Sequence, residues 1–379
     1  MPIKKVEKTI NSSNGPDTPG DGYLDDLMLF IKKGTVIPII SNSIRIEHVF
    51  NDEETLAKQF SGTADLDQGA DTTTEELTRK WADEINYPMD DANNLARVAQ
   101  FYQVELKDPE LAKTKYLKFL TDYLLDIGEE DENHREDVLQ LRKRNAPFSQ
   151  IVQKLDYPRL PAGMEDQDPL HILAKLPLKI YITTSHYNFM EQALEAVGRH
   201  PRTEVCFWSR EKSVLPTQAS DSKYMPPDEK QDQEEPPVVY HLFGLENNPQ
   251  TLVLSEDDYM NFLISVVQDT NTSRPVVPLW LRAGLAESRL LLLGYRVQDW
   301  DFRVLFKFIS HYREDNKSAP RGILIQMEPG PAHGGNKEKS IKYLKQYFDT
   351  EKFNIDWSNS EKFIQKLGIE WDKYIKGEA

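Results

Sequence analysis

The chain has 379 residues, a formal net charge of −16 and one cysteine, Cys206. At about 150 residues per domain, this length predicts roughly two domains. The negative charge repels phosphate backbones and argues against direct nucleic-acid binding, while a single cysteine excludes an intrachain disulfide and a Cys-rich zinc site. The start lacks the apolar core of a signal peptide, and no apolar run approaches the roughly 18 residues of a membrane span. We therefore expect a cytoplasmic protein without contact to a membrane.

The first segments predict a tail, a helix and a strand. Residues 1–22 offer little to bury and are expected to form a flexible tail. Residues 24–33 have the pattern of a short amphipathic helix, and residues 36–40 that of an apolar strand. Pro38 interrupts this strand, which favours an edge position or a strand that begins near the proline. A polar turn, residues 41–45, follows.

Residues 46–165 change in character, because helical patterns replace strands. Polar and charged side chains dominate the outer faces of these segments. The helices expected here span residues 75–87, 93–106, 112–125 and 136–144. Residues 65–73 are expected to form a mobile loop. We interpret the whole stretch as a helical insertion between the first strand and the rest of a sheet.

From residue 168 onward strands and helices alternate, which predicts an α/β fold with a doubly wound, mostly parallel sheet. The expected strands span residues 178–182, 204–208, 238–243, 251–254, 290–293, 322–326 and 353–356. Residues 210–237 are rich in Pro, Ser, Asp, Glu and Gln and are expected to form a surface loop, more simply a solvated connector than a docking segment. We expect the sheet domain to span residues 23–330 and a C-terminal α/β extension to span residues 331–379.

One stretch, residues 178–191, combines a buried strand with polar residues and the start of a helix. The strand ends in Thr183, Thr184 and Ser185, and the pattern becomes helical from His186. Ligands of open α/β sheets bind outside the carboxyl ends of the strands. Any small-molecule site should therefore involve residues 183–188.

Four segments together resemble the sirtuin-like NAD-consuming proteins, in particular their bacterial antiphage-defence branch. They are VIPIISNS (36–43), ITTSHYN (182–188), YHLFG with LSEDDY (240–244 and 254–259), and LGYRVQDWDFR (293–303). These resemble the family's first strand with its phosphate loop, its Thr-Thr-Asn-Tyr-Asp stretch, its Leu-His-Gly strand with the following acidic turn, and its Gly-Tyr-Ser segment. The resemblance covers roughly residues 24–360 and implies a Rossmann-like fold that binds NAD.

The sequence departs from the family at three positions of the expected mechanism. The glycine-rich loop, whose backbone would approach a pyrophosphate, reads SNSIR at residues 41–45. Arg45 offers a charged fork for phosphate instead. The family's catalytic Asn falls on Ser185, and its catalytic His falls on Phe243, which cannot move a proton. Phe243 is expected to fill the vacated space or to stack on a ring.

The leading interpretation is a NAD glycohydrolase with altered catalytic residues. Nicotinamide leaves without protonation, so orientation and water placement can supply much of the rate. The substitute catalytic residues that we expect are Ser185, His186 and His241. The residues expected to bind NAD, the substrate, are Ser41, Asn42, Ser43, Arg45, Thr183, Thr184, Asn188, Phe243, Gly244, Gly294, Tyr295 and Asp299.

Each candidate also has a structural explanation. Ser185 is equally suited to capping the helix that follows it. His186 is more often a solvated or backbone-bonded side chain, and His241 a hydrogen-bonded core histidine. Asp299 and Asp301 flank a tryptophan at a helix start, where carboxylates complement the helix dipole. We assign Asp301 to structure and leave Asp299 open as a ribose contact.

The resemblance also implies a setting. We expect an NAD-depleting effector of antiphage defence that stays inactive until a protein activator or an assembly event reorders the site, with a homo- or hetero-oligomeric state. The alternative is a catalytically dead nucleotide-binding or scaffolding subunit of a defence complex. An open, amide-lined cleft at residues 41–45 favours the enzyme, and a cleft filled by side chains favours the scaffold. No metal site is expected, because the acidic residues 256–258 match no calcium loop.

Overall fold

The computed structural model describes most of the chain. The described ranges are residues 22–61, 72–209, 235–271, 275–297, 299–313, 320–325 and 337–377. Nearly all of the predicted tail (1–22) and most of the predicted loops at 65–73 and 210–237 lie outside these ranges.

Seven parallel strands form one sheet in the order β3-β4-β2-β1-β5-β6-β7. The strands are β1 (Val36–Ile40), β2 (Ile180–Thr183), β3 (Arg202–Val205), β4 (Val238–His241), β5 (Arg289–Leu293), β6 (Gly322–Ile325) and β7 (Phe353–Asp356). Each overlaps a predicted strand, and the predicted Rossmann-like α/β class is confirmed. The central strand, β1, lies between β2 and β5, so the strand order reverses beside it and creates a topological switch point.

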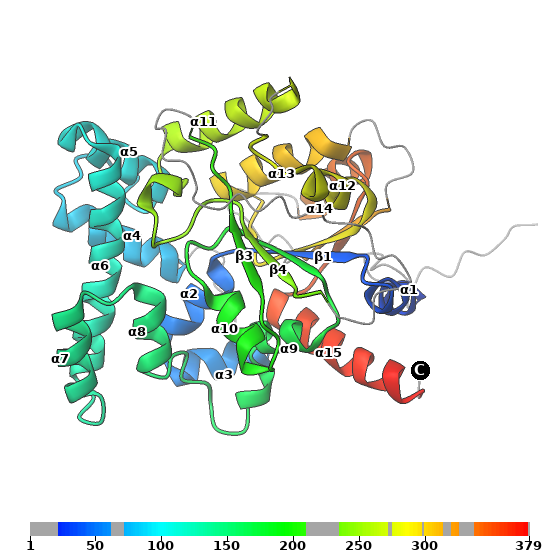
Figure 1. Ribbon diagram of the computed structural model, residues 1–379, viewed down its shortest axis with the longest axis horizontal. Coiled ribbons are helices and arrows are strands. Elements are labelled where there is room, and N and C mark those ends of the chain that lie inside the picture. The colour runs from blue at the N-terminus through cyan, green and yellow to red at the C-terminus, as the bar shows by residue number, and fades with distance from the viewer. Residues whose placement is uncertain are drawn as a thin grey trace, which may run out of the picture.

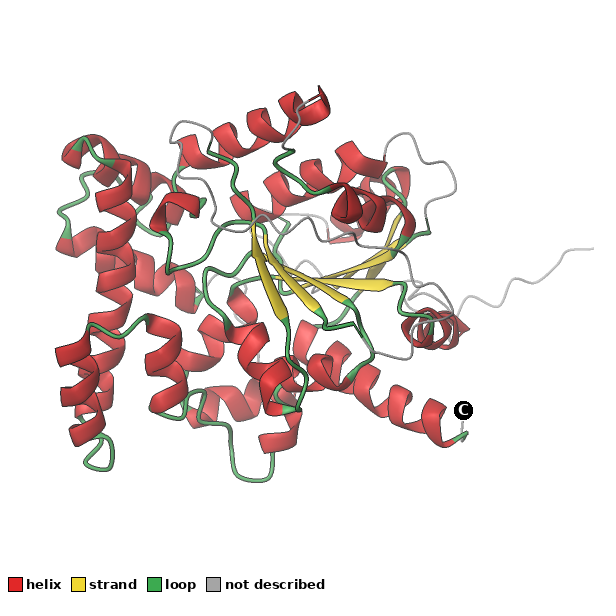
Figure 2. Ribbon diagram, in the orientation of Figure 1, coloured by secondary structure: helices red, strands yellow, loops and turns green. Residues whose placement is uncertain are grey.

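Helices cover both faces of the sheet (Figures 1 and 2). One face packs against α1 (Gly22–Lys32), α2 (Ser43–Phe50), α9 (Pro169–Lys175), α10 (Phe189–Ala196) and α15 (Ser360–Lys376), and the other against α11 (Glu256–Val267), α12 (Leu279–Glu287), α13 (Trp300–Arg313) and α14 (Lys337–Thr350). A hydrophobic core lies between the sheet and the helices on each face. Side chains alternate along β1, so Val36 and Ile40 pack into the core on the first face and Ile37 and Ile39 into the core on the second. Among the described helices, none has the length and apolar character to cross a membrane.

Between β1 and β2 the chain forms a group of helices. The group comprises α3 (Glu53–Ser61), α4 (Thr73–Glu84), α5 (Leu95–Leu106), α6 (Pro109–Glu129), α7 (Arg135–Arg144) and α8 (Phe148–Lys154). Of these, α4 to α8 lie at one side of the sheet (Figure 1, light blue to green) and α3 lies below it (blue). The helices predicted in this stretch correspond to α4 through α7. The division of the chain into domains stays a prediction.

Of the two alternatives predicted for the proline-containing strand, the edge position is wrong, because β1 is the central strand. The amide of Ser41 donates to the carbonyl of Leu293 on β5, and peptide directions alternate along a strand. The missing amide of Pro38 therefore faces β2. Pairing with β2 begins at Ile39, opposite Ile182, so the amide that the proline lacks would lie at the very start of the β1–β2 ladder.

The predicted strand at residues 251–254 is also wrong. A short 3-10 helix, Pro249–Thr251, precedes an extended segment that joins no described ladder. Both edges of β4 are already paired, with β2 and β3, so no edge is open to it. The chain doubles back at Gly244 (φ +89°), where an added Cβ would lie 2.3 Å from the carbonyl oxygen of Thr251.

Candidate functional site

A cavity of about 520 Å³ opens at the carboxyl ends of the strands, beside the switch point. Residues that follow β1, β2, β4, β5 and β7 line it, and α4, α5 and α11 complete its wall. This volume lies within the range of small-molecule sites. The predicted residues found in the lining are Ser41, Asn42, Ser43, Thr184, His186, Phe243, Gly294, Tyr295 and Asp299.

The loop after β1 folds back on the protein instead of filling the cavity. The Oγ of Ser41 accepts from the amide of Ser43 (3.2 Å), and the Oγ of Ser43 donates to the carbonyl of Gly294 (2.6 Å). At Gly294 (φ +78°) an added Cβ would lie 2.5 Å from Ile44 Cγ1. The close approach of the β1 loop and the β5 loop thus needs a glycine in the β5 loop. The first residues of α2 line the cavity.

The β2 and β5 loops are joined across the same edge. The hydroxyls of Thr184 and Tyr295 are 3.0 Å apart and hydrogen-bonded. Burial raises the pKa of Tyr295 well above its usual value, so this phenol stays protonated. Thr183 lies behind this contact, where its hydroxyl donates to the carbonyl of Ile40 (3.1 Å).

Ser185 and His241 lie behind the cavity wall and do not line it. The hydroxyl of Ser185 donates to Asn42 Oδ1 (2.9 Å), and α10 begins after Asn188, so Ser185 does not cap that helix. His241 is fully buried, and its Nδ1 is 3.0 Å from the carbonyl of Ser185 while its Nε2 is 2.8 Å from Glu191. Both ring nitrogens are engaged, which fits a core histidine that holds the β2 loop in place.

Arg45, Asn188 and Gly244 are also absent from the cavity lining. The guanidinium of Arg45 donates to Asp168 (2.9 Å), whose carboxylate also accepts from amides at the start of α9. Burial raises the pKa of Asp168, but the charge of Arg45, together with the amide of His171 and the nearby His48, more than offsets this, and the pKa is lowered. Arg45 therefore holds α2 against α9 and is not placed to meet a phosphate.

His186 lies in the cavity wall and is 7% exposed. Burial lowers its pKa to about 4, and the neighbouring His241 and Lys113 add to the shift. The imidazole is therefore neutral at pH 7 and a weak base. It suits hydrogen bonding to a substrate better than taking up a proton.

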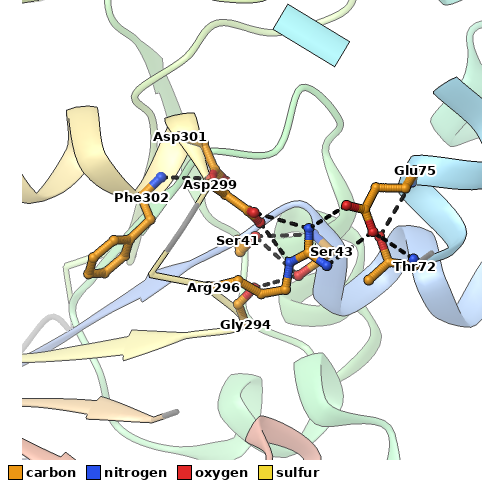
Figure 3. A network of polar contacts seen from close by, with 9 residues as sticks. All are labelled: Ser41, Ser43, Thr72, Glu75, Gly294, Arg296, Asp299, Asp301 and Phe302. Atoms are coloured by element: carbon orange, nitrogen blue, oxygen red, sulfur yellow. Dashed lines mark hydrogen bonds and ion pairs between the residues drawn. The ribbon is translucent and has the colours of Figure 1, made fainter. Parts of the chain in front are cut away.

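Arg296 is the hub of a polar network at the cavity (Figure 3) that the sequence did not reveal. Its guanidinium makes two bonds to Glu75 of α4 (both 3.1 Å) and two to Asp299 (both 3.0 Å). Burial acts to raise the pKa of each carboxyl, and Arg296 acts to lower it. At Glu75, Arg296 and the amide of Thr72 outweigh burial, so the pKa is lowered. At Asp299 burial outweighs Arg296, so the pKa is raised.

The cavity is strongly acidic. The lining carboxylates are Glu47, Glu75, Asp299, Asp301 and Glu361. Arg296 is the sole lysine or arginine among the described lining residues. Its guanidinium is already ion-paired with Glu75 and with Asp299. Burial, with the charge of Asp299 adding to it, raises the pKa of Asp301 to about 7. In the part of the chain that the structure describes, no group of His, Cys, Asp and Glu side chains is arranged to hold a metal ion.

One wall of the cavity is aromatic. The rings of Tyr259 and Trp300 stack at 6.4 Å, and Phe243 meets Tyr259 edge to face at 5.5 Å. Phe243 is only 1% exposed, so it supports the wall and leaves the cavity open. Stacked rings beside carboxylates form a surface that attracts a flat cation.

Comparison with known families finds a match, which covers part of the cavity lining. Residues 179–349 match the family described as SIR2-like domain. The matched range begins at β2 and ends in α14, so it covers the loops after β2, β4 and β5 but not the β1 loop, α2 or α4. No match was found among curated proteins.

Proposed function

We propose that this chain binds NAD in the cavity and hydrolyses it to nicotinamide and ADP-ribose, because residues 179–349 match the SIR2-like domain and such domains are NAD-dependent. The observation that supports this most is the open cavity at the switch point. Its wall includes the loops after β2, β4 and β5, all three within the matched range.

The chemistry of the lining agrees with NAD in part. The nicotinamide ring is a flat cation, and the Tyr259–Trp300 stack with its neighbouring carboxylates suits it. The pyrophosphate carries negative charge and finds Arg296 already ion-paired. The start of α2 remains as its partner through the positive end of the helix dipole, although the amide of Ser43 already donates to Ser41 Oγ (3.2 Å).

The predicted catalytic residues take different parts in this proposal. His186 is placed to contact the substrate, since it lines the cavity in its neutral form. Ser185 and His241 act as positioning residues, through Asn42 and through the backbone of the β2 loop. We further propose, on the family resemblance alone, a role in bacterial antiphage defence and activation by a protein partner or by assembly.

Two observations favour the alternative, a non-catalytic nucleotide-binding or scaffolding subunit. The position expected for a catalytic histidine holds Phe243, and the acidic lining opposes a dinucleotide with two phosphates. Analysis of the products distinguishes hydrolysis of NAD from binding without turnover.

The test is calorimetric titration of the full chain with NAD, followed by chromatography of nicotinamide and ADP-ribose. It is run on the protein alone and then with the products of neighbouring genes, beside Ser185→Ala, His186→Ala and His241→Ala. We expect binding and equimolar release of both products, with slower turnover in His186→Ala. Binding without turnover under every condition would overturn hydrolysis and favour the scaffold. No binding would overturn the NAD site and leave a scaffold or a sensor of another ligand.

A further inference from the structure

Glu47 stands apart from the other carboxylates of the cavity because its side-chain carboxyl has no hydrogen-bond or ion-pair partner among the described residues. Glu75 and Asp299 hold Arg296. Asp301 accepts from the amide of Phe302 (2.6 Å), and Glu361 lies 3.5 Å from Nε2 of His48. A carboxyl that lines a cavity without a partner is available to a ligand or a water molecule.

The position of Glu47 follows from the geometry of α2. Ser43, Ile44 and Glu47 occupy one face of the helix, at i, i+1 and i+4, and all three line the cavity. The first two are fixed against Gly294 by the hydroxyl bond and by the close contact described above. Glu47 therefore lies one turn into the helix whose N-terminus is the proposed pyrophosphate site.

Asp301, whose pKa is about 7, already accepts from the amide of Phe302. The titratable groups of the lining that are not carboxyls are poor proton acceptors. His186 is a weak base, and the phenols of Tyr259 and Tyr295 stay protonated because burial raises their pKa values well above 10. Phe243 has no titratable group. A group that takes a proton from water works best when its pKa lies near the working pH.

On the premise of the proposed function, we propose that Glu47 is the general base of NAD hydrolysis, in place of a histidine. Its carboxylate takes one proton from a water molecule whose oxygen bonds to C1′ of the nicotinamide ribose. The C1′–N bond breaks, and its electron pair neutralises the ring nitrogen of the departing nicotinamide. The products are nicotinamide and ADP-ribose, and Glu47 returns the proton to solvent. The same negative charge stabilises the positive ribose carbon as the bond breaks.

The groups around Glu47 set the pH at which it can act. Burial raises its pKa to about 8, Glu361 of α15, Asp299 and Glu75 of α4 add to the rise, and Arg296 opposes it. The base form grows as the pH passes 8. We therefore expect kcat/KM, which reports the free enzyme, to rise with pH and to level off above about 8.

The test compares Glu47→Gln, Glu47→Asp and Glu76→Gln in the full-length protein, under the condition in which the unchanged protein is active. Glu76 is an exposed residue of α4 and serves as the control. We expect Glu47→Gln to lower kcat by about 100-fold or more, with NAD binding retained and the rise toward pH 8 abolished. Glu47→Asp should keep part of the activity, and Glu76→Gln all of it. Circular dichroism verifies folding of each variant.

The outcomes separate this proposal from the function on which it rests. An active unchanged protein whose Glu47→Gln variant is within threefold of it, or keeps its pH profile, would overturn the role of Glu47 and leave NAD hydrolysis standing. An inactive unchanged protein would overturn NAD hydrolysis and with it any catalytic role of Glu47.

Discussion

Replacing Lys113 with methionine is expected to lower the free energy of unfolding by about 3–5 kcal/mol. Its ammonium donates to Asp258 Oδ1 (2.9 Å) and to the carbonyl of Leu252 (2.7 Å), and the two charged side chains are 6% and 7% exposed. Methionine preserves the packing of the aliphatic stem but leaves the carboxylate of Asp258 buried and unpaired. This pair joins α6 to the segment that carries Leu254 and Tyr259 into the cavity wall.

Chemical denaturation of Lys113→Met and Lys118→Met provides a matched measurement on one helix. Lys118 pairs with Asp122 at the surface, with side chains 61% and 42% exposed, and its loss should cost no more than about 0.5 kcal/mol. Adding Asp258→Asn to Lys113→Met should restore part of the loss, because a neutral amide still accepts from the amides of Leu254 and Ser255. A cost below about 1 kcal/mol for Lys113→Met would show that the pair does not anchor α6.

Glu47→Gln is expected to raise stability at alkaline pH, even though we expect it to slow turnover strongly. The folded pKa of Glu47, about 8, lies above its ordinary value of 4.5. A raised pKa means that the protonated form is favoured by folding, so its contribution is complete below pH 4.5 and is lost as the pH rises to about 8. The full shift corresponds to about 5 kcal/mol. Because the carboxyl borders an open cavity, we expect about 2–3 kcal/mol.

The measurement is the free energy of unfolding of the unchanged protein and of Glu47→Gln between pH 4 and pH 9. The difference should be close to zero near pH 4, grow between pH 4.5 and 8, and stay constant above that. Glu76→Gln, on the exposed side of α4, should match the unchanged protein at every pH. A difference that is constant across the range would contradict the raised pKa of Glu47.

Local sequence patterns sufficed for the elements of the sheet, because buried parallel strands are short apolar runs and their helices carry apolar stripes. Two local rules failed for reasons of tertiary structure. Pro38 is found in the central strand at a position where the amide that it lacks would lie at the start of the β1–β2 ladder, not in its middle. Residues 251–254 look like a strand but find both edges of β4 occupied.

The candidate site was only partly visible in the sequence. Residues at strand ends, such as Ser41, Thr184 and Gly294, could be predicted because parallel strands bring their carboxyl ends to one edge. Glu47 could have been found, since it lies four residues after Ser43 and α2 places both on one face. Arg296 and Glu75 are 221 residues apart in the sequence, and no local pattern pairs them.

The most direct test of the central claim, that this cavity is the NAD site, is calorimetric titration with NAD of the unchanged protein, Thr74→Trp and Glu76→Trp. Thr74 lines the cavity from the first turn of α4 and its hydroxyl has no partner among the described residues, whereas Glu76 faces solvent two positions later. We expect NAD to bind the unchanged protein and Glu76→Trp equally, and Thr74→Trp at least tenfold more weakly, because the indole fills the cavity. Equal binding by all three proteins, or no binding by the unchanged protein, would contradict the assignment of NAD to this cavity.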